Sequence, residues 1–256
     1  MKLLSISSQV VWGPVGNTAA VPALQAMGHE VLALPTVTLS NHPGHGAPAG
    51  FRTQAEDMAR MFAALEALGA LSSLDAMLTG YFVSVGQVEE VAGLLDRVPV
   101  PFLLVDPVMG DHGRLYVPQD VAEAIRDRLL PRATCLTPNG FELGWLSGQA
   151  VEDQESAVAA ARALGVPEVL ATSIPAGADR LATLLVTPDD VHAVVTPRLD
   201  HVPHGTGDFL SGLYLAHRLT QSPPDALAAA MKTLARAIAS SAGTSVLNVA
   251  AALHAA

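Results

Sequence analysis

The 256-residue chain is long enough for one large α/β domain or two small ones, and half of its residues are hydrophobic, which allows a sizeable core. Its net charge of −10 and the lack of a basic cluster argue against a nucleic-acid partner. No apolar run approaches the roughly 20 residues of a membrane span, no signal-peptide pattern opens the sequence, and the single cysteine, Cys135, fits a reducing compartment, so we expect a cytoplasmic protein without membrane contact.

Predicted strands and helices alternate along the chain, which is typical of a mostly parallel sheet covered by helices on both faces. The first half contains a strand at 2–7, a helix capped by Asn17 or Thr18 and ending at Gly28, a strand at 29–34, a helix at 54–68, a strand at 76–78, a helix at 87–98 and a strand at 102–106. The second half contains helices near 118–130, 139–147, 153–164, 208–219 and 223–240, and strands near 134–136, 168–172, 181–186 and 191–195.

Three stretches rich in Gly, Pro or His interrupt this order, at 7–16, 40–50 and 110–118. Ligands gather at the carboxyl ends of strands in an open parallel sheet, and the first and third stretches directly follow predicted strands. The alternative is that all three are ordinary surface loops. Their position favours a role in binding.

The segment Gly205-Thr206-Gly207-Asp208 leads into the helix predicted at 208–219. Glycines let backbone N–H groups converge and a helix N-terminus adds positive potential, so this turn suits a phosphate or a developing oxyanion. Asp208 at its rim can accept a proton from a substrate hydroxyl. Taken alone, the four residues also fit a tight turn with a helix cap.

Two common nucleotide-binding motifs are absent. The phosphate loop of P-loop kinases ends in a lysine, and neither lysine of this chain, Lys2 or Lys232, stands in such a motif. The spacing of Gly13-Pro-Val-Gly16 does not match the dinucleotide-binding fingerprint. A P-loop kinase, a conventional dehydrogenase and an enzyme with a Schiff-base lysine are therefore disfavoured.

Acidic and amide side chains follow two of the predicted strands. Asp106 ends the strand at 102–106, and Asn139 and Glu142 begin the helix at 139–147. Such oxygen ligands near a phosphate-binding turn can hold Mg²⁺, mostly through water. Alternatively, Asn139 and Glu142 are the cap and the first-turn acid of their helix.

Taken together, these segments resemble the ribokinase-like superfamily and, within it, the pyridoxal kinase family. The resemblance spans nearly the whole chain and rests on 8–13 with 16–20, Ser40-Asn41-His42 with Gly44 and Gly50, Thr79-Gly80-Tyr81, 106–111, 137–142, Thr172-Ser173 and 205–208. The last motif is common to most of the superfamily, whereas 8–20 separates pyridoxal kinases from hydroxymethylpyrimidine kinases. The resemblance implies one three-layer α/β/α ribokinase-like domain over residues 1–256, with a mostly parallel central sheet.

The resemblance also implies ATP-dependent phosphorylation of the 5′-hydroxymethyl group of pyridoxal, pyridoxine or pyridoxamine in vitamin B6 salvage. It makes Asp208 the catalytic base and Gly205, Thr206 and Gly207 the anion hole. Substrate-binding residues are then Ser8, His42, Pro43, Gly44, Tyr81 and Asp208. ATP-binding residues are Asp106, Asn139, Glu142, Thr172, Ser173 and Gly207, with Asp106 and Glu142 serving the metal. Mg²⁺, a monovalent cation (K⁺ or Na⁺) and a homodimer are implied as well.

The chain departs from the family pattern in the flap that follows His42. Pro43, Gly44 and His45 stand where Thr, Gly or Gln, and Tyr are common, and Pro43 has neither a hydroxyl nor a backbone donor. A kinase for hydroxymethylpyrimidine or another small hydroxymethyl compound therefore stays an alternative, as does a non-catalytic pyridoxal-phosphate-binding protein. The preferred vitamer is left open.

Five histidines lie in the loops with predicted function: His42, His45, His112, His201 and His204. No pair has the helical spacing of a zinc site, and no acidic partners stand beside them in that pattern. We therefore expect hydrogen-bonding loop residues rather than metal ligands.

Overall fold

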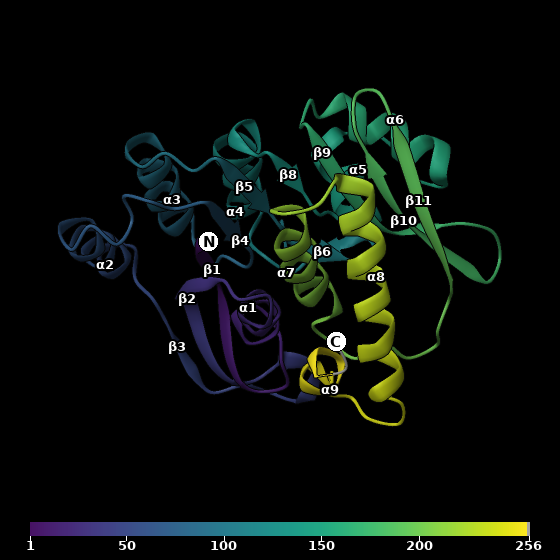
Figure 1. Ribbon diagram of the computed structural model, residues 1–256, viewed down its shortest axis with the longest axis horizontal. Helices are drawn as coiled ribbons and strands as arrows, with labels where there is room; N and C mark the ends of the chain where they lie inside the picture. The colour runs from purple at the N-terminus through teal and green to yellow at the C-terminus, as the bar shows by residue number, and fades with distance from the viewer. Residues whose placement is uncertain (255–256) are drawn as a thin grey trace.

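The computed structural model describes residues 1–254 and has three layers, with a central sheet between two layers of helices (Figure 1). The strands of the sheet are β1 (Lys2–Trp12), β2 (Glu30–Asn41), β3 (Gly50–Arg52), β4 (Ala76–Thr79), β5 (Phe102–Val105), β8 (Cys135–Leu136), β9 (Glu168–Pro175), β10 (Arg180–Val186) and β11 (Val191–Pro197). Their order within these residues is β11-β10-β9-β8-β5-β4-β1-β2-β3. The strands from β9 to β2 are parallel, and β3, β10 and β11 are antiparallel to their neighbours, which confirms the predicted mostly parallel sheet.

Helices cover both faces of the sheet. One face carries α1 (Asn17–Ala26), α7 (Thr206–Arg218), α8 (Pro223–Ser240) and α9 (Val249–Leu253). The other carries α2 (Ala55–Ala67), α3 (Val85–Arg97), α4 (Gln119–Ala124), α5 (Gly140–Ser147) and α6 (Gln154–Ala163). The short segments are η1 (Pro43–His45), the hairpin of β6 (Gly110–Asp111) and β7 (Arg114–Leu115), and the turns η2 (Ile125–Leu129) and η3 (Leu130–Arg132) after α4.

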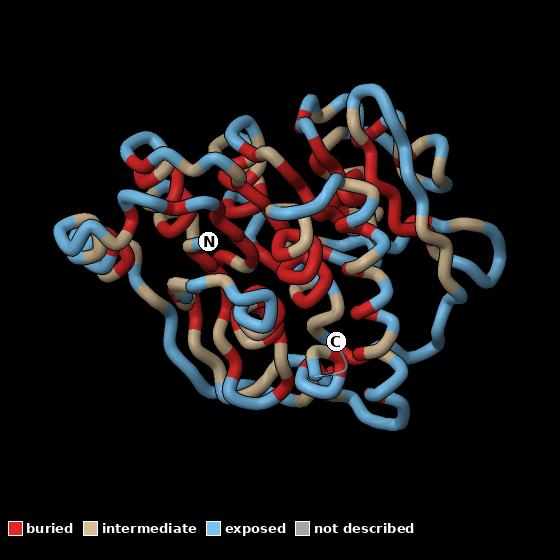
Figure 2. Tube along the Cα trace, in the orientation of Figure 1, coloured by how far each residue is buried: buried red, intermediate tan, exposed pale blue. Residues whose placement is uncertain are grey.

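Two apolar cores result from the alternation of side chains along the strands. In β1, Leu4 and Ile6 face the core beneath α2 to α6, whereas Leu3 faces the core beneath α1, α7 and α8. Both cores consist of buried residues, and their backbone runs through the centre of the molecule (Figure 2). No helix within residues 1–254 is long and apolar enough to cross a membrane.

The predicted irregular stretch at 7–16 is wrong for its first half, because β1 continues to Trp12. The extension pairs with β2 as far as Trp12 and Asn41, with an irregularity between Ser7 and Gln9. Val10, Val11 and Trp12 have the β-branched and aromatic side chains that favour strands. The strand ends at Trp12, before Gly13 and Pro14, and Pro14 cannot donate to a ladder.

The predicted cap of α1 is also wrong. Gly16 is the N-cap residue and makes no side-chain hydrogen bond. Asn17 instead donates to the carbonyl oxygens of Ser7 and Leu34, and the hydroxyl of Thr18 exchanges hydrogen bonds with the backbone of Val10. Both polar side chains therefore join the helix to the adjacent strands, where buried carbonyl groups need partners.

Two short elements were not predicted from the sequence, and one predicted helix is divided in the structure. β3 is only three residues long, and α9 has five residues, capped by the side chain of Asn248. The helix expected near 118–130 divides into α4 and the turns η2 and η3 as it approaches Pro131. These segments are too short to give a clear hydrophobic period.

Candidate active site

The predicted site residues come together at the edge of the sheet where the parallel strands end. Tyr81 follows β4, Asp106 follows β5, and the segment from Thr137 to Glu142 follows β8. Helix α7 starts at the same edge, because Gly205 packs against the loop after β1. A Cβ at Gly205 would collide with the carbonyl oxygen of Pro14, and its φ of 91° also requires glycine.

Asp208 lies in the first turn of α7, next to Gly207. Burial raises the pKa of Asp208 to about 6, although the backbone N–H groups of Gly16 and of Asp208 itself donate hydrogen bonds to its carboxylate. A side chain added at Gly207 would meet no atom within 4 Å. The helix start therefore combines positive potential, free approach and a carboxylate that is mostly ionised at neutral pH.

Asp106 is buried next to the other acids of the site. Burial raises the pKa of Asp106 well above its ordinary value, and the carboxylates of Asp208 and Glu142 raise it further. The hydroxyl of Ser211 opposes that rise by donating a hydrogen bond to Asp106, and the nearby hydroxyl of Thr137 also lowers the pKa of Asp106. Because like charges raise one another's pKa, their mutual effect places the three acids in one cluster.

Glu142 performs the capping role that the sequence left as one alternative. Its Oε2 accepts from the backbone N–H of Asn139 at 3.0 Å, while Asn139 accepts in return from the N–H of Glu142 at 2.9 Å. Its Oε1 accepts from the N–H groups of Met109 and Gly110 at 2.8 and 3.4 Å. Val108, directly before these two residues, has a φ of 40°, which is strained for a β-branched residue. Burial raises the pKa of Glu142 to about 7 despite these donors.

On the other side of Asp208, Ser8 and Tyr81 are held by the ends of β1 and β4. The backbone N–H of Tyr81 donates to the hydroxyl of Ser7 at 3.2 Å, and its carbonyl accepts from the hydroxyl of Thr36 at 2.6 Å. Ser8 is buried against Gly16, where any side chain would collide with the Ser8 oxygens. Burial raises the pKa of the Tyr81 phenol, and Arg52 opposes this effect.

The flap residues meet the segment that precedes α7. The rings of His42 and His204 stack with centroids 4.1 Å apart, and Nδ1 of His42 accepts from the N–H of Gly44 at 3.1 Å. The ring of His45 lies edge-on to His204 and packs on Trp12, with the centroids of the His45 and Trp12 rings 4.6 Å apart. The histidines thus place Pro43 and Gly44 beside the start of α7. Burial first, and then the charges of His204 and His45, lower the pKa of His42 to about 4.

Thr172 and Ser173 lie beside the capped start of α5. The N–H of Thr172 donates to the carbonyl of Pro138 at 2.8 Å, and a bridge joins Asn139 to Thr172. Ser173 is exposed and has a φ of 59°. Both residues therefore reach the same edge as Glu142.

Comparison with known proteins identifies the family. Residues 20–250 match the protein family described as phosphomethylpyrimidine kinase. The chain belongs to this kinase family. It is 40% identical over 252 residues to a pyridoxine/pyridoxal/pyridoxamine kinase of Bordetella avium, covering 93% of this chain and 84% of that relative. It is also 39% identical over 228 residues to a pyridoxal kinase of Leifsonia xyli, covering 85% and 81%.

Solved structures of the phosphomethylpyrimidine kinase family and its relatives have the same fold. A pyridoxal kinase from Leishmania donovani in complex with ADP and pyridoxine superimposes with a TM-score of 0.92 at 32% identity, covering 99% of this chain and 94% of that chain. A phosphomethylpyrimidine kinase homologue from Bacteroides thetaiotaomicron, in a crystal form with pyridoxal, gives 0.91 at 26% identity, covering 99% and 94%. These matches confirm the expected three-layer fold.

The acids of this kinase fit a magnesium ion that takes most of its ligands from water and phosphate. Within residues 1–254, no three His, Cys, Asp or Glu side chains form a ready-made metal cage. Mg²⁺ commonly binds through one or two carboxylates together with substrate phosphates. Asp106 accepts a hydrogen bond at Oδ2 from Ser211 and keeps further lone pairs for a cation or its water ligands. The Glu142 oxygens already accept from three backbone groups, which suits a contact through water.

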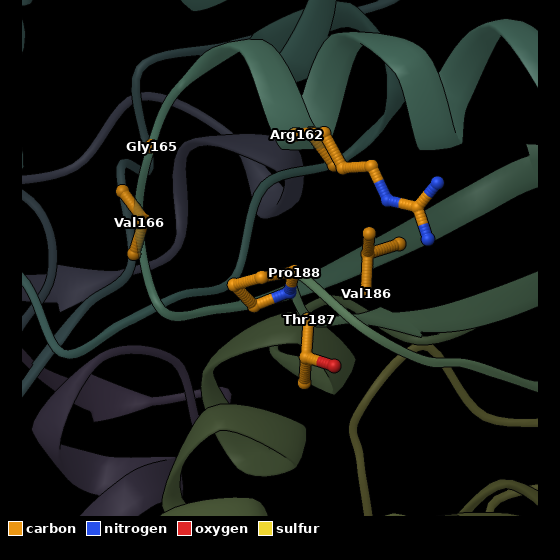
Figure 3. Close-up of a pocket in the computed structure, with 7 residues that line it drawn as sticks. Arg162, Gly165, Val166, Val186, Thr187 and Pro188 are labelled. Carbon is orange, nitrogen blue, oxygen red and sulfur yellow. The ribbon is translucent and has the colours of Figure 1, made fainter.

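The surface has two hollows, one away from the candidate carboxylates and one next to the start of α7. One, of about 290 Å³, lies between the end of α6 and the turn joining β10 to β11, where Arg162 and Thr187 are drawn (Figure 3). It is at the start of β9, away from the candidate carboxylates. The other, of about 500 Å³, is lined by 201–204 and by the connection from α8 to α9, immediately before Gly205.

Several residues of the site did not stand out in the sequence. Gly16 donates its N–H to Asp208, and Ser211 bridges Asp106 and Thr137. Burial raises the pKa of Tyr116, and the negative charges of Glu142, Asp106 and Asp208 contribute to the same rise. Ser211 has a weak sequence signal, since it stands one helical turn after Asp208. The other two contacts depend on loops whose path has no local pattern.

Proposed function

We propose that this protein is an ATP-dependent kinase that phosphorylates the 5′-hydroxymethyl group of pyridoxal, and also of pyridoxine and pyridoxamine, to form the 5′-phosphates. The observation that carries the proposal is Asp208 at the open N-terminus of α7, in a chain whose relatives are named pyridoxal kinases. A pyridoxal kinase of the same fold was solved with ADP and pyridoxine.

Asp208 accepts the proton of the substrate hydroxyl as that oxygen attacks the γ-phosphorus of ATP. A base with a pKa of about 6 is ionised at neutral pH and still has useful proton affinity. The N–H groups of Gly205, Thr206 and Gly207 stabilise negative charge on the transferring phosphoryl group, with ADP as the leaving group.

Asp106 and Glu142 are the residues that would hold Mg²⁺, with Glu142 acting through water. When bound, the ion neutralises charge on the phosphates. Asn139, Thr172 and Ser173 flank this side and would bind phosphate oxygens. We place the nucleobase in the hollow of about 500 Å³ before Gly205, which is large enough for part of a small ligand.

Ser8, His42, Gly44 and Tyr81 would bind the pyridine ring, and Pro43 would contribute an apolar contact. The observed stacking of His42 on His204 supports a flap that shields the acceptor from water. The altered flap also favours a second candidate, a kinase for hydroxymethylpyrimidine, in line with the description of the matched family.

We further propose a cytoplasmic homodimer with one kinase domain over residues 1–256, which uses Mg²⁺ and either K⁺ or Na⁺. The free outer edge of β3 supports dimerisation, since it ends the sheet. Val11 and Phe51 are 79% and 67% exposed, and the strand register places them on one side of that edge. Exposed apolar groups beside an open edge are typical of an interface.

A coupled ADP-release assay with Mg-ATP tests the main proposal, with pyridoxal phosphate followed by its absorbance. Pyridoxal, pyridoxine, pyridoxamine and hydroxymethylpyrimidine are compared at equal concentration. Faster turnover of a B6 vitamer supports the proposed function, and faster turnover of hydroxymethylpyrimidine supports the second candidate. ATP binding without transfer to any acceptor would indicate a non-catalytic binding protein.

A further inference from the structure

Ser211 joins the helix of the candidate base to the carboxylate on the metal side. It lies on α7, one turn after Asp208, and only 2% of it is exposed. Its Oγ is 2.8 Å from Oδ2 of Asp106 and 2.9 Å from Oγ1 of Thr137. Asp106 is 105 residues away in the sequence, so this contact exists only in the folded chain.

The direction of these hydrogen bonds follows from the number of protons. Ser211 has one hydroxyl proton. Asp106 can only accept when it is ionised to hold a cation, so in that state the proton of Ser211 points to its Oδ2. The hydroxyl of Thr137 must then donate to the Ser211 oxygen. The resulting chain runs from Thr137 through Ser211 to Asp106, and Ser211 is the hydroxyl that donates to the carboxylate.

Helix α7 does not need Ser211 for its attachment to the sheet. Phe209, Leu210, Leu213 and Tyr214 are buried on it, and the Tyr214 hydroxyl donates to Glu168 at 2.9 Å. Arg218 pairs with the same Glu168 at 2.7 Å. The hydroxyl of Ser211 is therefore not needed to attach α7 to the sheet. Its hydrogen bond instead holds the Asp106 carboxylate.

Asp106 needs such a contact because two other carboxylates surround it. Repulsion from Asp208 and Glu142 favours rotation of the Asp106 side chain away from them. A hydrogen bond to one oxygen restricts that rotation and holds the group beside Asp208. Partners of this kind behind a metal ligand orient it, and their loss commonly costs about 10–100-fold in metal affinity or activity.

We propose that Ser211 is a positioning residue that, with Thr137 behind it, fixes the Asp106 carboxylate beside Asp208 for a divalent cation bound together with a nucleotide. The inference rests on the proposed kinase function for the identity of the nucleotide. It does not depend on which acceptor is phosphorylated.

The test is Mn²⁺ binding in the presence of ADP, followed by electron paramagnetic resonance, with Ser211→Ala, Thr137→Val and Thr137→Ser. Ser211→Ala should weaken Mn²⁺ binding by about 10-fold or more, while ADP affinity without cation stays within about 2-fold. Thr137→Val should weaken it less, and Thr137→Ser should recover most of that loss. Ser147→Ala is the control, because this hydroxyl donates only to carbonyls of its own helix, α5.

Mn²⁺ binding that is unchanged in Ser211→Ala would overturn the proposal, and so would a wild-type ADP complex that binds no Mn²⁺. An equal loss of Mn²⁺ and cation-free ADP affinity would also overturn it, since that indicates general damage to the fold. If Ser211→Ala does not fold, Thr137→Val decides by the same criteria. A wild type that binds Mn²⁺ with ADP but phosphorylates no B6 vitamer contradicts the proposed function and leaves the role of Ser211 intact.

Discussion

The backbone N–H of Gly16 donates a hydrogen bond to the carboxylate of Asp208, which connects the loop after β1 to the first turn of α7. The same loop packs its Pro14 carbonyl on Gly205, the N-cap of α7. Substrate-side and phosphate-side segments are thus in direct contact at the candidate base. Small changes in this loop should therefore act on catalysis as well as on stability.

Asp208→Asn should lower kcat by about 10²–10⁴-fold, the usual contribution of a general base. The asparagine oxygen can still accept from the Gly16 amide, so ADP affinity should change little. The coupled ADP-release assay measures kcat, and calorimetry measures the ADP affinity. Asp225→Asn, in the first turn of α8, is the control for loss of a helix-start acid. Turnover close to wild type would remove Asp208 from the mechanism.

Gly16→Ala should destabilise the protein more than Gly28→Ala. Both glycines have positive φ, which costs an alanine about 1–2 kcal/mol. A Cβ at Gly28 meets no atom within 4 Å, whereas one at Gly16 collides with the oxygens of Ser8, which adds about 1–3 kcal/mol. Urea unfolding of the two variants gives the difference directly. Equal free energies of unfolding would show that the contact with Ser8 relaxes without cost.

Acid should weaken the fold through His42. Its pKa is about 4 in the folded chain, because of burial first and then His204 and His45, against 6.5 as the ordinary value. The unfolded chain therefore binds more protons between these values, so the contribution of His42 to stability is present above pH 6.5 and is lost as the pH falls toward 4.

His42→Asn removes the imidazole and keeps an oxygen that can accept from the Gly44 amide. The variant should lose less stability than wild type between pH 6.5 and 4, as measured by urea unfolding at several pH values. His192→Asn, on exposed β11, serves as the control. Parallel pH profiles for wild type and His42→Asn would contradict the prediction.

Phe51→Arg should convert the proposed dimer to a monomer. The substitution places a charge on an exposed apolar side chain beside the free edge of the sheet, where desolvation of the charge would oppose association. Sedimentation velocity at micromolar concentration measures the change. Leu68→Arg, at the end of α2 and 80% exposed, is the matched control and should leave the dimer intact. A wild type that sediments as a monomer would contradict the proposed dimer.

The sequence by itself predicted a mostly parallel sheet covered by helices on both faces, and the site residues that it suggested stay a prediction. Hydrophobic periods of 2 and 3.6 residues are local, and they located the central strands and the main helices. The acidic and amide side chains of Asp106, Asn139 and Glu142 follow predicted strands, and ligands gather where parallel strands end. The capping pair of Asn139 and Glu142 was also legible, since its partners stand three residues apart.

Only the tertiary structure decided which of these groups touch. The bond from Ser211 to Asp106 depends on α7 crossing the ends of β5 and β8, and the stacking of His42 on His204 depends on the path of the flap. The continuation of β1 to Trp12 likewise needs pairing with β2 in addition to the strand-favouring side chains of its last residues. Contacts between distant segments are fixed by packing across the whole sheet, and no local period of the sequence encodes them.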